Sequence, residues 1–203
     1  AAILFDEPLT VIDPHLKWLL RRKLKQIHEQ FKLTLVYVTH DQNEALTFAD
    51  KVVVMTEGEV LQLGTPQQLF ETPAHTFVGH FIGSPGMNFL PCMIDGDSAV
   101  VDTHQIRLTE SVVKKAQQQQ QQLLQIGVRP EFLRLSSEDS ATRFAVRITN
   151  IEDLGNFKMV SVRFGEHNLK VKVPEQQVIS SESVYLEFIP EQTKLYANSI
   201  LIG

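Results

Sequence analysis

The sequence predicts two regions of different fold class, an α/β region over residues 1–82 and an all-β barrel or sandwich over residues 83–203. An apolar strand, an amphipathic helix and a second strand follow one another in the first region. Several short strands with alternating apolar and polar residues make up the second. The stretch FIGSPGMNFLPC at 81–92 lies between the two patterns, and Gly83, Pro85 and Gly86 within it predict a hinge.

Composition is typical of an ordinary globular protein with a sizeable core, because 43% of the 203 residues are hydrophobic and 21% are charged. This length can hold one large or two small domains. The single cysteine, Cys92, excludes an intramolecular disulfide and suits a reducing compartment. No apolar run approaches the roughly 18 to 20 residues that span a bilayer, and no signal peptide opens the sequence. We therefore expect any membrane association to go through a partner.

Neither region is basic. Residues 1–82 contain 7 Lys and Arg against 10 Asp and Glu, and residues 83–203 contain 12 against 14. The two net charges, −3 and −2, argue against nucleic acid as the main partner.

The first strand ends on two carboxylates. Residues 1–5 are apolar without alternation, as in a central parallel strand that helices cover on both faces. Asp6 and Glu7 follow at the carboxyl end of this strand, the edge at which open α/β sheets bind ligands. A strand that merely exits into a solvated turn would leave the same local pattern, so the residues that follow decide between the two interpretations.

A helix is predicted next, over about 18 residues from Pro14. Asp13 has the place of an N-cap and Pro14 that of the first helical residue. One apolar face then recurs at steps of three and four, at Leu16, Leu19, Leu20, Leu24, Ile27 and Phe31. Lys17 belongs to a group of basic residues on this helix that we interpret as a solvated outer face.

The second strand, over residues 33–39, also ends on polar residues. His40 and Asp41 follow it, and Asp41 with Glu44 has the form of a capping box that starts another helix. A strand, a helix and a second strand with these connection lengths form one βαβ unit with a right-handed crossover. Asp6, Glu7 and His40 are then expected to converge at one edge of the sheet.

Three such groups have a joint chemical use. An aspartate at a strand end can hold Mg²⁺ through its water shell, and a neighbouring glutamate can orient and deprotonate a water molecule. A histidine can bond the terminal phosphate of a nucleotide. A lone histidine at a strand end is more often structural, but the acid pair on the neighbouring strand favours phosphoryl transfer to water.

Four blocks in order, ILFDEP, LTVID, VYVTHDQNEA and ADKVVVMTEGEVLQLGTP, resemble the second half of the nucleotide-binding domain of ATP-binding-cassette (ABC) transporters. The resemblance implies a partial P-loop NTPase cassette core over residues 1–82, with ATP and Mg²⁺ as cofactors. It implies that Asp6 is the Walker B aspartate that holds the metal through water and that Glu7 is the catalytic glutamate. Asp13 corresponds to the end of the D-loop at a dimer interface, and His40 to the switch histidine.

Two motifs of that family are missing. A phosphate-binding loop needs a glycine-rich turn followed by Lys and Ser or Thr, and no Gly-Lys dipeptide occurs in the sequence. The Gly-Gly of the family's signature motif is missing as well. We therefore expect a C-terminal fragment of a longer protein, which by itself neither grips ATP well nor hydrolyses it.

The rest of the α/β region is predicted to contain a hairpin of residues 51–55 and 60–64 and helical pieces at 66–70 and 76–81. In the all-β region, the glutamine run at 117–122 indicates a solvated loop or a frayed helix end. Arg129 and Glu131 flank a proline, and we interpret them as an internal ion pair rather than a ligand site.

Three blocks of the second region, at 81–90, 127–131 and 152–156, resemble the regulatory domain of sugar-importer ATPases of the maltose and glycerol-3-phosphate type. That domain is an OB-fold-like barrel called the transport-associated (TOBE) domain. The resemblance implies an ATPase subunit that energises uptake of a sugar or a glycerol-3-phosphate-like solute. It implies a homodimer through cassette and regulatory domains, bound to integral-membrane permease subunits at the cytoplasmic face of a bacterial inner membrane. A cytosolic regulatory protein is a further expected partner on the barrel.

Two alternatives stay open. The barrel could make this chain a non-catalytic regulatory or dimerisation module. The ATPases of polyamine, iron and anion importers carry related barrels, although with other hinge sequences. Binding of nucleic acid by the barrel is disfavoured, because the sequence has no basic groove interleaved with aromatic residues.

Overall fold

The computed structural model describes residues 2–10, 12–117, 123–179 and 184–202. They form two compact units, Ala1–Gln68 and Leu69–Gly203, which we call the first and the second unit. The division falls within helix α3 (Pro66–Glu71), ahead of the hinge that the sequence predicts. Residues 118–122 of the glutamine run lie outside the described residues. In the part of the chain that the structure describes, no helix is long and apolar enough to cross a membrane.

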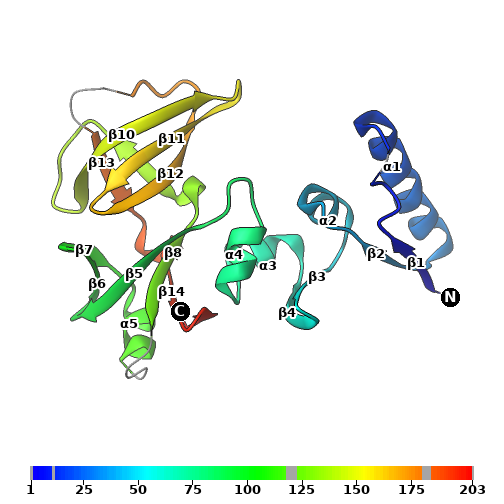
Figure 1. Cartoon of the computed structure of the whole chain (residues 1–203), viewed down its shortest axis with the longest axis horizontal. Coiled ribbons are helices and arrows are strands. Elements are labelled where there is room, and N and C mark those ends of the chain that lie inside the picture. Colours follow the sequence, from blue (N-terminus) through cyan, green and yellow to red (C-terminus); the bar gives the residue numbers. More distant parts are fainter. Residues whose placement is uncertain (1, 11, 118–122, 180–183, 203) are drawn as a thin grey trace. The chain divides into compact units, whose positions relative to one another are not determined.

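The first unit contains the predicted βαβ unit. Strands β1 (Ala2–Asp6) and β2 (Thr34–Val38) pair in parallel, and helix α1 (Pro14–Phe31) connects them (Figure 1). Asp13 caps α1, because its Oδ1 accepts the backbone N–H groups of the second and third residues that follow it, both at 3.1 Å. Both strands therefore end at the same edge of their sheet, as the sequence predicts.

Burial in this unit differs from the prediction. The sequence predicts that helices cover β1 on both faces, but most of its residues are exposed and Leu4 is 68% exposed. Within the part of the chain that the structure describes, β1 pairs with β2 alone, and this two-stranded sheet lacks the helix layers on both faces that would bury a central strand. The predicted apolar face of α1 is likewise open over Leu16 and Phe31, which are 51% and 61% exposed. A groove of about 510 Å³ runs along this face, lined by Ile12, Leu16, Leu19, Leu20 and Lys23.

A short helix and a hairpin complete the first unit. Helix α2 (Gln42–Phe48) follows β2, and strands β3 (Val52–Thr56) and β4 (Glu59–Gly64) pair antiparallel, as predicted. Glu57 and Gly58 form the two-residue turn with φ of 50° and 83°. Positive φ at both positions matches the right-handed twist of the strands.

The second unit begins with the end of α3 and helix α4 (Thr76–Phe81) and continues into two antiparallel sheets (Figure 1). Its remaining elements are β5 (Asn88–Asp95), β6 (Ser98–Val101), β7 (His104–Arg107), α5 (Glu110–Ala116), β8 (Leu124–Val128), η1 (Pro130–Phe132), β9 (Leu133–Ser136), β10 (Arg143–Asp153), β11 (Phe157–Phe164), β12 (His167–Pro174), β13 (Val184–Phe188), η2 (Pro190–Gln192), β14 (Lys194–Ala197) and β15 (Ile200–Leu201). One sheet has the strand order β15-β14-β8-β5-β6-β7, and the other β12-β11-β10-β13-β9.

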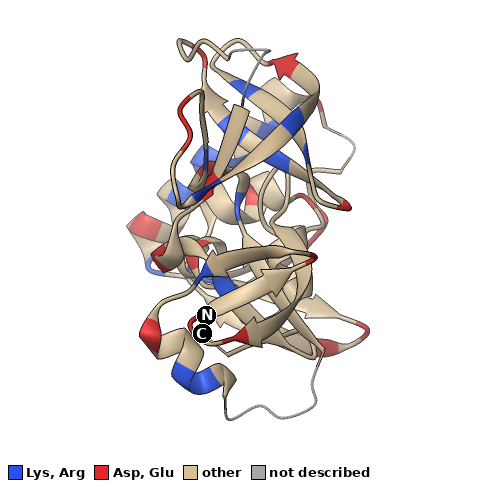
Figure 2. Cartoon of the chain, turned by 90° about the vertical axis from the view of Figure 1, so that its left-hand side faces the viewer, with Lys and Arg blue, Asp and Glu red and all other residues tan. Residues whose placement is uncertain are grey.

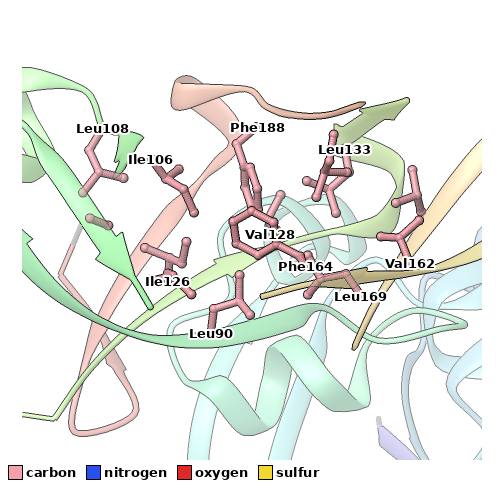
Figure 3. Close-up of a cluster of buried hydrophobic side chains, with 14 of the residues drawn as sticks. Leu90, Ile106, Leu108, Ile126, Val128, Leu133, Val162, Phe164, Leu169 and Phe188 are labelled. Atoms are coloured by element: carbon pink, nitrogen blue, oxygen red, sulfur yellow. The ribbon is translucent and has the colours of Figure 1, made fainter. Parts of the chain in front are cut away.

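The core of the second unit follows from the alternation in its strands. Val160, Val162 and Phe164 of β11 are fully buried, and the residues between them face outward. Figure 3 shows Phe164 and Phe188 among aliphatic side chains that come from both sheets. The alternating strands that the sequence predicts are therefore confirmed, and they enclose one apolar core.

Basic and acidic residues of the second unit occupy different parts of the fold. Figure 2 shows Lys and Arg mainly along the strands and Asp and Glu mainly at turns and strand ends. Asp97, Asp102 and Glu166, for example, lie at the turns of three hairpins. Both signs are present over the unit, which fits the slightly negative net charge of this part of the sequence.

A buried arginine ties the two short helices to the sheet. Arg129 follows β8 and donates hydrogen bonds to the backbone oxygens of Leu69, Phe70 and Ile82, and its guanidinium lies 4.0 Å from the ring centroid of Phe70. These carbonyls lie in the last turn of α3 and at the C-cap of α4, where helices leave oxygens without intrahelical partners.

The expected pairing of Arg129 with Glu131 is therefore wrong. The guanidinium of Arg129 bonds carbonyls in the last turn of α3 and at the C-cap of α4. Glu131 instead forms an ion pair with Lys172, with 3.5 Å between Oε1 and Nζ.

Candidate active site at the ends of β1 and β2

The chain bends sharply as it leaves β1, and this bend sets the position of Glu7. Its φ is 43°, a left-handed conformation that residues other than glycine seldom adopt. Its N–H still donates to Val38 O at 2.9 Å, which extends the pairing with β2 by one residue. The Thr10 hydroxyl lies 3.1 Å from Glu7 O and 3.2 Å from Glu7 Oε2. The loop therefore holds both the backbone and the carboxylate of Glu7.

Glu7 and His40 meet at this edge, as the sequence predicts. His40 Nδ1 lies 3.0 Å from Glu7 Oε1, although 33 residues separate them in the chain. The hydrogen bond from His40, aided by the one from Thr10, lowers the pKa of Glu7 below its usual value. The same contact raises the pKa of His40, because the carboxylate stabilises the imidazolium. Both side chains remain open to solvent, so a substrate can reach them.

Asp6 ends β1 beside this pair. It is exposed, and its carboxylate has no hydrogen-bond or ion-pair partner among the residues that the structure describes. The described residues also contain no cluster of three or more His, Cys, Asp or Glu side chains suited to a metal ion. One free carboxylate fits Mg²⁺ that keeps most of its water shell, rather than a metal enclosed by protein ligands.

Asp13 lies at the start of α1, and its carboxylate is used by the helix. The Oδ1 atom caps the N–H groups of His15 and Leu16, and the side chain is exposed. The structure does not bring Asp13 into hydrogen-bond contact with Glu7 or His40. Its expected place at a dimer interface stays a prediction, because the structure contains a single chain.

A buried carboxylate lies behind His40. Glu44 is only 2% exposed, and its Oε2 accepts hydrogen bonds from the hydroxyls of Tyr37 and Thr39, both at 3.0 Å. Its Oε1 faces Lys17 Nζ of α1 at 3.4 Å. Burial and the bond to Glu44 raise the pKa of Tyr37, so its hydroxyl stays a donor.

The predicted capping box is thus only half formed. Asp41 Oδ1 accepts the N–H groups of Asn43 and Glu44, as a cap should. The Glu44 side chain does not return to Asp41, whose N–H instead donates to Thr39 Oγ1 at 3.0 Å. The expectation that Lys17 belongs to a solvated outer face is also wrong, because its amine pairs with this buried carboxylate.

Sequence reasoning did not single out Tyr37, Thr39 or Thr10 for this site. A signal existed for the first two, because strand alternation places Tyr37 and Thr39 on one side of β2, toward the helix that carries Glu44. None existed for Thr10, since its contact depends on the left-handed bend at Glu7.

Comparisons with known proteins agree with the architecture of the second unit. A family model described as the MalK OB fold domain matches residues 83–133, and one described as the TOBE domain matches residues 126–194. The first covers β5 to η1 and the second β8 to the start of β14. The solved structure of the molybdate-binding protein ModG aligns at a TM-score of 0.43 and 10% identity over 53% of the chain and 94% of its own length, a likeness too weak to inform the fold.

Curated relatives extend over most of the chain. The sn-glycerol-3-phosphate import ATP-binding protein UgpC of Bordetella parapertussis is 40% identical over 174 residues, which cover 86% of this chain and 47% of the relative. The putative uncharacterized ABC transporter ATP-binding protein YcjV of Escherichia coli K12 is 36% identical over 83% of this chain and 47% of its own length. The sulfoquinovosyl glycerol transport ATP-binding protein SmoE of Agrobacterium fabrum is 34% identical over 85% of this chain and 48% of its own length.

The chain spans about half the length of the curated relatives it matches. Residues 83–194 carry the MalK OB fold and TOBE domains, and the chain is a homologue of the ATP-binding proteins of ABC transporters.

Proposed function

We propose that this chain is part of the ATP-hydrolysing subunit of an ABC importer, with residues 1–82 as a partial P-loop cassette core and residues 83–203 as the regulatory domain. The observation that carries the proposal is the contact of Glu7 with His40 at 3.0 Å, at a strand edge that also presents Asp6. The family match of the second unit and the relatives support the same assignment.

The chemistry assigned to this edge is transfer of the terminal phosphoryl group of ATP to water. Glu7 is the general base: its carboxylate is ionised at neutral pH and open to solvent, and the bonds from His40 and Thr10 that orient it also lower its pKa and so its strength as a base. While Nδ1 of His40 bonds Glu7, its Nε2 is free, and in the protonated form that the Glu7 contact favours this nitrogen can donate a hydrogen bond to the terminal phosphate. Thr10 keeps the Glu7 carboxylate oriented toward its partner.

Asp6 is the residue that would hold Mg²⁺, through water. An ion held by Asp6 with the nucleotide would supply positive charge to offset the charge that develops on the phosphates. The described residues offer no glycine-rich phosphate loop.

The relatives support the proposed solute class. Two of them are named for sn-glycerol-3-phosphate and for sulfoquinovosyl glycerol, solutes that share a glycerol unit. We therefore favour a sugar or a glycerol-3-phosphate-like solute over a polyamine, an iron complex or an inorganic anion. The proposed assembly is a homodimer, with Asp13 at the interface, bound to integral-membrane permease subunits at the cytoplasmic face of the inner membrane. A cytosolic regulatory protein on the barrel completes the proposed partners.

The test is a Glu7→Gln substitution in the complete ATP-binding protein, assayed with its permease. We expect ATP to bind as before, because the phosphate-binding groups are untouched, and hydrolysis to fall by two to four powers of ten, the range for loss of a general base (about 10²- to 10⁴-fold). Glu57→Gln, in the exposed hairpin turn, is the matched control and should leave turnover unchanged. Undiminished hydrolysis by the Glu7 variant would refute the assignment.

A non-catalytic dimerisation module is the second candidate. Most of the buried apolar side chains belong to the second unit. The core of this unit needs no nucleotide to form, which favours a role for the barrel that is independent of ATP. Sedimentation of the whole chain without nucleotide tests this candidate, because a module of this kind should dimerise unaided. A strict monomer at high concentration would argue against it.

A further inference from the structure

Glu44 stands apart from the other acidic residues of the first unit, because it is buried and the proposed reaction does not use it. Taking a carboxylate out of water costs free energy unless hydrogen bonds and an opposite charge compensate. Two hydroxyl donors compensate Oε2, whereas Oε1 has no hydrogen-bond donor among the described residues and faces only the ammonium charge of Lys17 at 3.4 Å. Helix capping does not account for the arrangement, since its side chain makes no bond to the cap residue Asp41.

The hydrogen bonds of Glu44 involve the residues on either side of His40. Thr39, the residue before it, donates its hydroxyl to Glu44 Oε2. The same hydroxyl accepts the N–H of Asp41, the residue after it, at 3.0 Å. One side chain therefore fixes the chain on both sides of His40. A change in this hydroxyl network would change the direction in which the imidazole leaves the backbone.

Glu44 also links the two segments that carry the candidate site. Its partner Lys17 lies in the first turns of α1, directly after the loop that runs from Glu7 to Asp13. Its other partner, Tyr37, lies in β2 next to Val38, whose carbonyl accepts the N–H of Glu7. The segment of Glu7 and the segment of His40 are thus joined twice, once by backbone pairing and once through Glu44.

We propose that Glu44 is the positioning residue for His40: through Thr39 and Lys17 it holds the imidazole so that Nδ1 faces Glu7 and Nε2 faces the substrate side. This inference deepens the proposed ATPase function and rests on it for its catalytic meaning. The geometric part can be tested without turnover.

The first experiment reads the His40 ring in the 203-residue chain by ¹⁵N NMR, at a pH where the imidazole is neutral. The partner of a histidine sets which nitrogen carries the proton, so the bond to Glu7 should keep the proton on Nδ1. Thr39→Val removes the bridging hydroxyl at nearly constant shape, and Glu44→Gln removes the charge that Lys17 requires. In both variants we expect the proton to move to Nε2.

Two matched variants separate positioning from folding. Thr39→Ser restores the hydroxyl and should restore the Nδ1 signal. Glu29→Gln makes the same chemical change at an exposed site of α1 and should have no effect. If Thr39→Val and Glu44→Gln lower the melting temperature but keep the proton on Nδ1, Glu44 is merely structural and the proposal is overturned.

The second experiment measures ATP hydrolysis by the same variants in the complete ATP-binding protein. A misplaced catalytic group lowers kcat on the order of 100-fold, and we expect this loss in kcat to exceed any change in KM for ATP. Equal losses for Thr39→Ser and Thr39→Val would contradict the inference. If the unmodified protein does not hydrolyse ATP at all, the proposed function fails, and the NMR result still decides whether Glu44 positions His40.

Discussion

At the scale of single residues, the pair of Glu7 and His40 predicts a pH window. The pKa of His40 is raised, so the charge–charge stabilisation of the contact is complete below about 6.5 and is lost as pH rises through the raised value, while the hydrogen bond from a neutral Nδ1–H remains. The pKa of Glu7 is lowered, so the same charge–charge stabilisation is complete above about 4.5 and is lost as pH falls through the lowered value. An NMR titration should therefore place His40 above its usual pKa, and Glu7→Gln should return it. A titration that the substitution leaves unchanged would exclude the contact.

Arg129 carries the strongest residue-scale prediction for stability. Arg129→Met leaves three buried carbonyl oxygens without a donor, and hydrogen bonds to a charged group contribute about 1.5–3 kcal/mol each. Burial lowers the pKa of Arg129 to about 10, so the cation persists at neutral pH. We expect the free energy of unfolding of the second unit to fall by at least about 3 kcal/mol. Urea unfolding monitored by near-ultraviolet circular dichroism measures it. Arg134→Met, at an exposed site on β9, should change the free energy of unfolding by less than about 0.5 kcal/mol, and equal losses would refute this role.

Tyr196 offers a smaller and independent check on the same region. Its hydroxyl is buried and donates to Pro73 O at 2.9 Å, which joins β14 to the loop between α3 and α4. Tyr196→Phe keeps the ring and its edge contact with Phe89 but leaves that carbonyl without its donor. The free energy of unfolding should fall by about 1–3 kcal/mol in the same urea assay. No change would mean that water replaces the hydroxyl.

At the scale of elements, Asp13 allows capping to be separated from charge. Asp13→Ala removes the acceptor of two N–H groups at the start of α1 and should cost about 1 kcal/mol, with a measurable loss of helical circular dichroism. Asp13→Asn keeps an oxygen at the same place and should retain the helix. If the asparagine variant keeps the helix but weakens dimerisation in the complete protein, the charge of Asp13 acts at the proposed interface. A helix that tolerates alanine equally well would contradict the capping role.

The helices and strands could be predicted because they depend on local sequence. Burial and side-chain partners could not, because they depend on tertiary packing. The Asp13-Pro14 start of α1 and the alternation around Val162 depend on neighbours in sequence, and both appear as expected. Burial of Leu4 and Leu16 requires another layer, and no local pattern says whether one is present. Glu44 has the right spacing for a capping box, but the hydroxyls of β2 and the amine of α1 compete for it. The contact of Glu7 with His40 could be predicted because parallel strands end together.

At the scale of the whole molecule, the two units differ in how much apolar surface they bury. In the first unit, the buried apolar side chains among the described residues are Leu9, Val52 and Val54, whereas the second unit encloses a core that both of its sheets supply. Because opening free energy rises with buried contacts, amides of β1, β2 and α1 should exchange faster than those of β8, β11 and β12. Native-state hydrogen exchange with mass spectrometry measures this directly, and trypsin should cut first within α1, which contains several Lys and Arg residues. Equal protection of both units would show that the chain unfolds as one cooperative body and would contradict the division at residue 68.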